Sequence, residues 1–111
     1  MEPNILLIGK SLSTLNILCQ ELKKFDRKVF YANSQELIES NLKNNSIDLI
    51  SVGAGLPDDV TEQFVNFTKN IAPETPIHIM KKTPGMTPYS QIDFTNEKAV
   101  MWKLFNGIKA K

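Results

Sequence analysis

Apolar residues along the chain form short continuous runs, and between these runs they recur every three or four positions. The continuous runs predict buried strands, and the helically spaced segments between them predict helices. The predicted strands are residues 4–8, 28–32, 47–52 and 76–80. Residues 47–52 are largely apolar at successive positions, so both faces of this strand must be covered, as in the centre of a parallel α/β sheet.

Capping residues mark where the first three helices are expected to begin. The candidate caps are Ser11 or Ser13 for the first helix, Asn33 for the second and Asp59 for the third. Asn33 and Asp59 are each followed three positions later by a glutamate, which is the spacing of a capping box.

The pattern changes after the fourth predicted strand. Residues 81–91 contain two prolines, a glycine and no periodicity, which predicts a loop. Residues 92–94 predict a short fifth strand at a sheet edge, and Thr95 or Asn96 can cap a final helix. This helix is expected to bury Met101, Leu104, Phe105 and Ile108.

Strands that alternate with helices predict one domain over residues 1–111, a three-layer α/β sandwich with a parallel five-stranded sheet. Ligands of such sheets bind beyond the carboxyl ends of the strands, so residues 53–55 mark where a site is expected. Gly53, Ala54 and Gly55 carry no side chain that can take up a proton, attack a substrate or hold a metal.

Composition narrows the function classes. The net charge of +1 is too small for a general nucleic-acid-binding surface. No segment has the pattern of a signal peptide or a membrane span, so we expect a cytoplasmic protein with neither nucleic acid nor membrane as a partner. The single cysteine, Cys19, excludes an intramolecular disulfide, and we expect it to be a small buried residue.

The run DLISVGAGLPDDVTEQFVNFTKNIAPETPIHIM, residues 48–80, resembles the middle of a response-regulator receiver domain. It has the third strand, a Leu-Pro turn, a helix and a proline-bounded fourth strand in the order of that family. The resemblance implies a single receiver-like domain with strands in the receiver or flavodoxin-like order. The fourth helix of that family is expected to be shortened or missing, because residues 81–91 are too short and too rich in proline to form a regular one.

The functional residues of receivers are not found at the matching positions. Gly9 and Lys10 stand where the resemblance places the magnesium-holding acids, and Gly53 stands where it places the phosphate-accepting aspartate. The chain is therefore similar to a degenerate receiver, or pseudo-receiver. That resemblance implies a non-catalytic protein-interaction module in bacterial signalling or regulation, without a metal ion or a cofactor.

The same positions predict an alternative function. Lys10 and Ser11 follow the first strand, Lys81 and Lys82 follow the fourth, and Gly53 and Gly55 are expected to lie between them. Lysines together with glycine and helix N-terminal N–H groups can hold an anion, so this edge predicts a metal-free site for a phosphate-bearing ligand. In the other interpretation the lysines are simply solvated, as surface lysines commonly are.

The opening LLIGKSLSTLNIL, residues 6–18, is also similar to the B component of cellobiose-type sugar phosphotransferase systems. That component is a four-stranded α/β domain with a phosphate-carrying cysteine just after its first strand. Gly9 or Lys10 occupies this position here, so the phosphotransfer role does not carry over, and the Leu-Pro turn fits a receiver better.

Three residues near the end of the chain are candidates for binding a protein partner: Met86, Tyr89 and Trp102. Aromatic and methionine side chains are enriched at interfaces, and the partner would be another protein or a second copy in a dimer. The alternative is that these residues cover sheet surface left open by the missing helix.

His78, the only histidine, lies in an apolar strand and is expected to be structural. Because the strand ends offer almost no titratable groups, we expect no enzyme activity.

Overall fold

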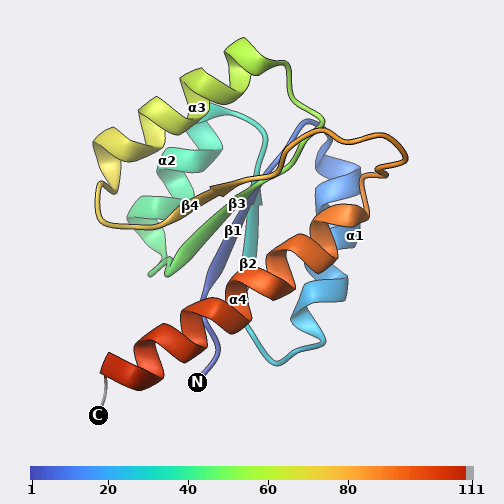
Figure 1. Ribbon diagram of the computed structural model, residues 1–111. Helices are drawn as coiled ribbons and strands as arrows, with labels where there is room; N and C mark the ends of the chain where they lie inside the picture. The colour runs from blue at the N-terminus through green and yellow to red at the C-terminus, as the bar shows by residue number, and fades with distance from the viewer. Residues whose placement is uncertain (110–111) are drawn as a thin grey trace.

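The computed structural model describes residues 1–109, in which four strands alternate with four helices (Figure 1). The strands are β1 (Ile5–Ile8), β2 (Val29–Ala32), β3 (Leu49–Val52) and β4 (Ile77–Ile79). The helices are α1 (Leu12–Lys23), α2 (Gln35–Asn44), α3 (Asp58–Ile71) and α4 (Ser90–Lys109). The strands pair in parallel in the order β2-β1-β3-β4, which is compatible with a flavodoxin-like layout. No helix within residues 1–109 is both long enough and apolar enough to cross a membrane.

The sheet is buried between two layers of helices, which explains why its central strands are apolar at successive positions. Ile5 and Leu7 of β1 lie in one core cluster, whereas Leu6 and Ile8 lie in the other. All four side chains are at most 1% exposed. Helices α1 and α4 cover the first face, and α2 and α3 cover the second (Figure 1).

The prediction of a five-stranded sheet is wrong, because the sheet in the described part of the chain has four strands. Residues 92–94, predicted as the fifth strand, lie in the first turns of α4. Backbone bonds from Ser90 N to Thr87 O and from Ile92 N to Tyr89 O, both 3.0 Å, already wind the chain helically there. The predicted loop is confirmed up to Tyr89, and α4 follows it directly. Four strands is also the number implied by the resemblance to the sugar phosphotransferase component.

The buried face of α4 differs from the predicted one. Between residues 90 and 106 its fully or nearly buried residues are Gln91, Thr95 and Ala99, which recur every four positions. Because two of the three are polar, hydrophobicity does not mark this face. The predicted face is largely exposed: Met101 is 51% exposed, Leu104 64% and Phe105 59%. The side chain of Ile108 lies outside the described residues.

The helix caps agree only partly with the capping patterns. Ser11 caps α1 as predicted, since its Oγ accepts a hydrogen bond from the backbone N–H three residues on, at 3.4 Å. The cap of α2 is Ser34, not Asn33. The N-cap of α3 is Pro57, so Asp59 caps nothing. It lies with Asp58 in the first turn, where a carboxylate interacts favourably with the helix dipole.

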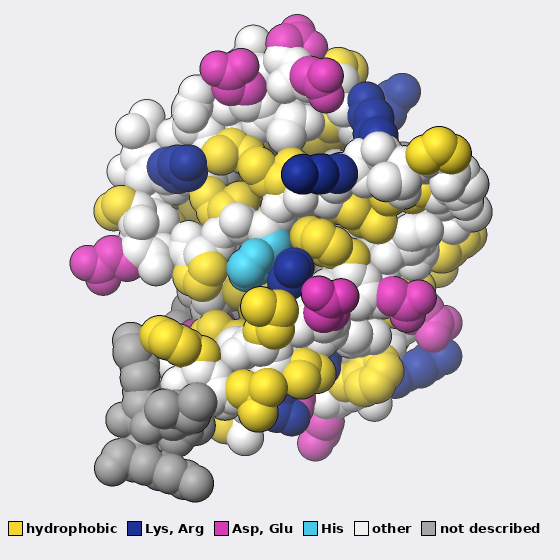
Figure 2. All heavy atoms as spheres, in the orientation of Figure 1, with side chains coloured by type: hydrophobic (Ala, Val, Ile, Leu, Met, Phe, Trp, Pro, Cys, Tyr) yellow, Lys and Arg dark blue, Asp and Glu magenta, His cyan; other side chains and the backbone are white. Residues whose placement is uncertain are grey.

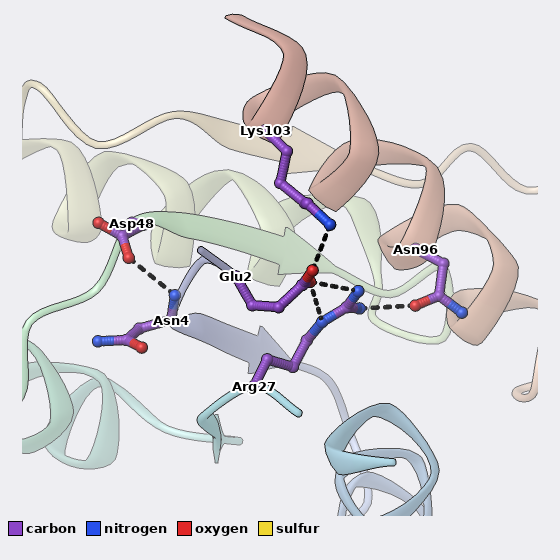
Figure 3. A network of polar contacts seen from close by, with 6 residues as sticks. All are labelled: Glu2, Asn4, Arg27, Asp48, Asn96 and Lys103. Carbon is purple, nitrogen blue, oxygen red and sulfur yellow. Dashed lines mark hydrogen bonds and ion pairs between the residues drawn. The ribbon is translucent and has the colours of Figure 1, made fainter. Parts of the chain in front are cut away.

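A network of charged groups joins the start of the chain to α4 at the amino ends of the strands, which we call the amino edge (Figure 3). The side chain of Arg27 is 4% exposed and donates to Glu2 Oε1 from Nε at 3.1 Å and from Nη2 at 2.9 Å. Arg27 Nη1 donates to Asn96 Oδ1 at 2.6 Å, and Lys103 Nζ donates to Glu2 Oε2. These bonds fix the position of α4 against the sheet.

The network also changes the acidity of Glu2. The hydrogen bond from Lys103, with a smaller contribution from Arg27, holds the pKa of the Glu2 carboxyl below its usual range. Partial burial opposes this effect but does not cancel it. Beside the network, Asp48 Oδ2 accepts a hydrogen bond from Asn4 N at 2.8 Å (Figure 3). Asp48 is therefore occupied at the amino edge, far from the residues that follow β3.

Candidate functional site

A cavity of about 390 Å³ lies at the carboxyl ends of the strands, which we call the carboxyl edge. Residues that follow β1 and β3 both line it. The strand order reverses between these two strands, since β2 lies on one side of β1 and both β3 and β4 lie on the other. In open α/β sheets this reversal point is the usual ligand position, and the cavity falls within the range of about 300–1,000 Å³ typical of small-molecule sites.

Two glycines border the cavity where β1 and β3 end. Gly53 N donates to Ile8 O at 2.9 Å, and Gly9 N donates to Ala32 O at 3.2 Å, so both residues continue the sheet bonding. A Cβ atom on Gly9 would lie 2.9 Å from Leu15 Cδ2, and one on Gly53 would lie 2.6 Å from Gln91 Oε1. Neither position has space for a side chain without movement of its neighbour, so the two glycines allow Leu15 and Gln91 to pack closely against the backbone there.

The start of α1 provides the anion-attracting part of the lining. Lys10, Ser11 and Thr14 all border the cavity, and the first N–H groups of the helix carry its positive dipole end. Lys82 adds a second ammonium group from the segment after β4. No Asp or Glu is among the described residues that line the cavity, so its charged side chains are all positive.

The rest of the lining is mostly apolar. It comes from α1, from the end of β4 and from the loop that crosses the carboxyl edge (Figure 1). Its apolar side chains are Leu15, Leu18, Ala54, Met80, Met86 and Pro88. A ligand in this cavity would therefore contact positive charge at one part of its surface and hydrocarbon or thioether groups at another.

The predicted anion-site residues are brought together with one exception. Lys10, Ser11, Gly53 and Gly55 all line the cavity. Lys81 lines a neighbouring hollow of about 310 Å³, which also contains Asp58 and Thr61 of α3. Lys82, the second lysine after the fourth predicted strand, borders both spaces and takes the place expected for Lys81.

Gln91 is a site residue that sequence reasoning missed. Only 5% exposed, it lies in the first turn of α4 and lines the cavity. Its Nε2 donates to Ser51 O at 3.2 Å and to Ser51 Oγ at 3.3 Å, and Ser51 Oγ also bonds Thr95 Oγ1 at 2.8 Å. The four-residue spacing of Gln91 and Thr95 is a signal that could have indicated a polar buried helix face.

The three candidate partner-binding residues have different surroundings. Met86 lines the cavity, Tyr89 is 51% exposed, and Trp102 is partly buried against the core cluster beneath α1 and α4. Met86 and Trp102 therefore contact other parts of the protein, whereas about half of Tyr89 is exposed to solvent.

The titratable groups that could support catalysis lie away from the cavity lining. Burial raises the pKa of the Cys19 thiol, which donates to Val29 O at 3.1 Å. Burial, and to a smaller extent the charge of Lys98, lowers the pKa of His78 on β4. Within residues 1–109, no group of three or more His, Cys, Asp or Glu side chains is arranged to hold a metal ion.

Comparison with known proteins adds no family to this geometry. No protein-family model matches the chain, and no curated protein matches it. The functional interpretation therefore depends on the site itself.

Proposed function

We propose that this protein is a small-ligand-binding domain that holds an anionic, phosphate-bearing molecule in the carboxyl-edge cavity without a metal ion. The main support for the proposal is that the charged side chains lining the cavity are all positive, at the point where the strand order reverses. The start of α1, Lys10 and Lys82 converge there, and no acidic side chain opposes them. An anion gains from both the helix dipole and the ammonium groups, as in other N-terminal phosphate sites.

The proposed function is binding without catalysis. The polar side chains of the lining are hydroxyls, one amide and lysines, and no histidine, cysteine or carboxylate stands beside them to act as a base. Gly53 occupies the position where the receiver resemblance places a phosphate acceptor. A bound phosphate group would therefore be held by hydrogen bonds and charge and would not be transferred to the chain.

A backbone amide NMR titration with inorganic phosphate, with and without magnesium, tests this function. We expect saturable shifts in residues 9–11 and 53–55 that do not require magnesium. Lys10→Gln should weaken binding by about threefold, the effect of one exposed charge. Lys69→Gln is the matched control, because Lys69 lies in the last turn of α3, away from the cavity. The proposal is wrong if these residues do not shift, or if the two variants weaken binding equally.

A second function, a receiver-like protein-interaction module, is favoured by a separate observation. Val100, Met101 and Leu104 of α4 are each more than half exposed, at 52%, 51% and 64%. Ile79 on the edge strand β4 is 47% exposed, and hydrophobic side chains gather over this face of the molecule (Figure 2). Contiguous apolar surface of this kind is typical of interaction sites. A role in bacterial signalling has only the resemblance of residues 48–80 in its support.

Light scattering after size-exclusion chromatography tests this second function as self-association. We expect a dimer that Leu104→Glu converts to a monomer. Ile17→Glu is the control, because Ile17 is 45% exposed on a different helix, α1. A monomeric wild-type protein at high concentration would remove self-association from the proposal. Trp102→Ala, which tests the residue selected from the sequence, should weaken the dimer less than Leu104→Glu because Trp102 is partly buried.

A further inference from the structure

We infer that the cavity selects a phosphate monoester that contains an aromatic ring with an N–H or O–H group, and that Gln91 Oε1 accepts the hydrogen bond from that group. This inference rests on the proposed function and adds to it the chemical class of the ligand. It is carried by the hydrogen bonding of Gln91, by the shape of the lining at Gly53, and by the apolar side chains between Gln91 and the start of α1.

The orientation of the Gln91 amide is determined by its neighbours. The backbone oxygen of Ser51 can only accept, so the amide group that faces it at 3.2 Å must be the NH₂ group. Nε2 lies within hydrogen-bond distance of both Ser51 O and Ser51 Oγ. The Oε1 atom is therefore left as an acceptor, and it is directed toward Gly53, another residue of the cavity lining.

Gln91 Oε1 has no donor among residues 1–109, although the residue as a whole is only 5% exposed. Every completely enclosed side-chain nitrogen or oxygen in this part of the chain does have a hydrogen-bond partner. An oxygen without a partner must therefore reach open space, and the space that Gln91 borders is the cavity. A nearly buried acceptor that faces a cavity is a specific position for a ligand donor, because leaving it unpaired is unfavourable.

Residue 53 affects the position of this acceptor. A side chain at Gly53 would collide with the Gln91 amide, since a Cβ atom there would lie 2.6 Å from Oε1. Glycine at residue 53 therefore allows both the close packing of Gln91 and the position of Oε1 that a ligand would meet.

The apolar lining indicates what lies between the two polar ends of the ligand. Leu15 and Leu18 contribute from α1, Met80 from the end of β4, and Met86 from the loop. Methionine sulfur contacts aromatic rings favourably and adapts to their shape. An aromatic ring with a phosphate at one end and a donor at the other satisfies the positive start of α1, the apolar lining and Gln91 together. Nucleoside monophosphates and simple aryl phosphates share this chemistry.

Two matched pairs of compounds test the inference and distinguish the two sources. The first pair is adenosine monophosphate and purine riboside monophosphate, which lacks the amino group. The second is 4-hydroxyphenyl phosphate and phenyl phosphate, which lacks the hydroxyl. We expect calorimetric titration of the wild-type protein to show about tenfold tighter binding of the donor-bearing member of at least one pair. The pair that shows it identifies the source of the ligand.

Variants show whether Gln91 causes this preference. Gln91→Met keeps the length of the side chain but removes the acceptor, so the two members of the pair should bind with nearly equal affinity. Gly53→Ala should have the same effect by displacing Oε1, and it serves if Gln91→Met does not fold. Thr95→Val is the control, because it breaks the bond to Ser51 Oγ without removing the Gln91 amide, and it should preserve the preference.

The outcomes separate this inference from the proposed function. If inorganic phosphate binds at residues 9–11 but both members of each pair bind equally to the wild-type protein, the inference is wrong and the anion site remains. If the preference exists but persists in Gln91→Met and Gly53→Ala, Gln91 is not the acceptor and the inference is again wrong. If neither phosphate nor any of the four compounds binds, both proposals fail.

Discussion

At the amino edge of the sheet, charged groups are paired with one another, whereas at the carboxyl edge they are left facing an open space. Arg27, Glu2 and Lys103 form ion pairs that join the N-terminal segment to α4 (Figure 3). Lys10 and Lys82 at the carboxyl edge form no ion pair with the described residues. The same helix α4 spans both ends, with Lys103 in the paired network and Gln91 at the cavity.

This difference separates stability from binding. A network whose charged groups all have partners within the chain stabilises the fold, and few of its donors and acceptors remain available to bind a ligand. Unpaired lysines, a helix N-terminus and a buried acceptor contribute less to the fold, but they are available to a ligand. Substitutions at the amino edge should therefore mainly lower the stability of the fold, and substitutions at the carboxyl edge should mainly lower ligand affinity.

The largest effect is expected from Arg27→Met at the amino edge. The substitution leaves the Glu2 carboxylate without its most buried partner and removes the bond to Asn96. We expect a loss of about 2–3 kcal/mol in the free energy of unfolding, measured by urea denaturation, because the substitution removes charge-assisted hydrogen bonds to Glu2 and Asn96, although Glu2 keeps Lys103 as a partner. Phosphate affinity should be unchanged as long as the protein remains folded.

The matched control for Arg27→Met is Lys24→Met. Lys24 pairs with Glu21 on the surface, with 69% and 44% of the two side chains exposed. Exposed pairs of this kind contribute only about 0.2–1 kcal/mol. Equal losses for the two variants would show that the amino-edge network does not stabilise the protein, and the comparison between the edges would then fail.

Gly53→Ala should have a smaller effect on stability and a larger one on binding. Its Cβ atom would lie 2.6 Å from Gln91 Oε1, so the amide must move within a buried network. We expect a loss of about 1–2 kcal/mol in the free energy of unfolding, as for other additions to a filled interior. Gly55→Ala is the control, since no atom lies within 4 Å of its added Cβ. If Gly55→Ala costs as much as Gly53→Ala, the close contact with Gln91 is not the cause.

The two edges also differ in how much of them could be predicted from the sequence. The first four strands are correctly predicted because continuous apolar runs such as residues 5–8 require burial on both faces. The sequence also predicts that the glycines after β1 and β3 lie at one edge of the sheet, because the carboxyl ends of parallel strands meet there. The same argument predicts the position of Lys10 and Ser11, and in the structure they line the cavity together with Gly53.

The parts that were not predicted depend on contacts between distant residues. Gln91 and Thr95 are polar, so hydrophobicity does not mark the helix face that they form, and their burial is explained by hydrogen bonds to Ser51, about 40 residues earlier in the chain. The sequence likewise predicts a strand at residues 92–94 and burial of Met101 and Leu104, because it does not show which side of α4 faces the sheet. The Arg27–Glu2 pair likewise joins residues that no sequence motif connects.

The smallest of the predicted effects is a change of stability with pH that belongs to the amino edge. The hydrogen bond from Lys103 and the charge of Arg27 lower the pKa of Glu2 in the folded protein below its ordinary value of about 4.5. The unfolded chain therefore binds a proton at Glu2 more readily than the folded chain does. The stabilisation is complete above about pH 4.5, and it is lost as the pH falls through the lower folded-state value.

Urea denaturation of the wild-type protein and of Glu2→Gln between pH 7 and pH 3 measures this effect as a difference between the two proteins. We expect the wild-type protein to be the more stable at pH 7 and the difference to shrink below about pH 4.5. Taking the difference removes the contribution of His78, which titrates in both proteins. A difference that stays constant down to pH 3 would mean that Glu2 is not held by its charged partners. The amino edge would then be no better paired than the carboxyl edge, where the charges face the cavity.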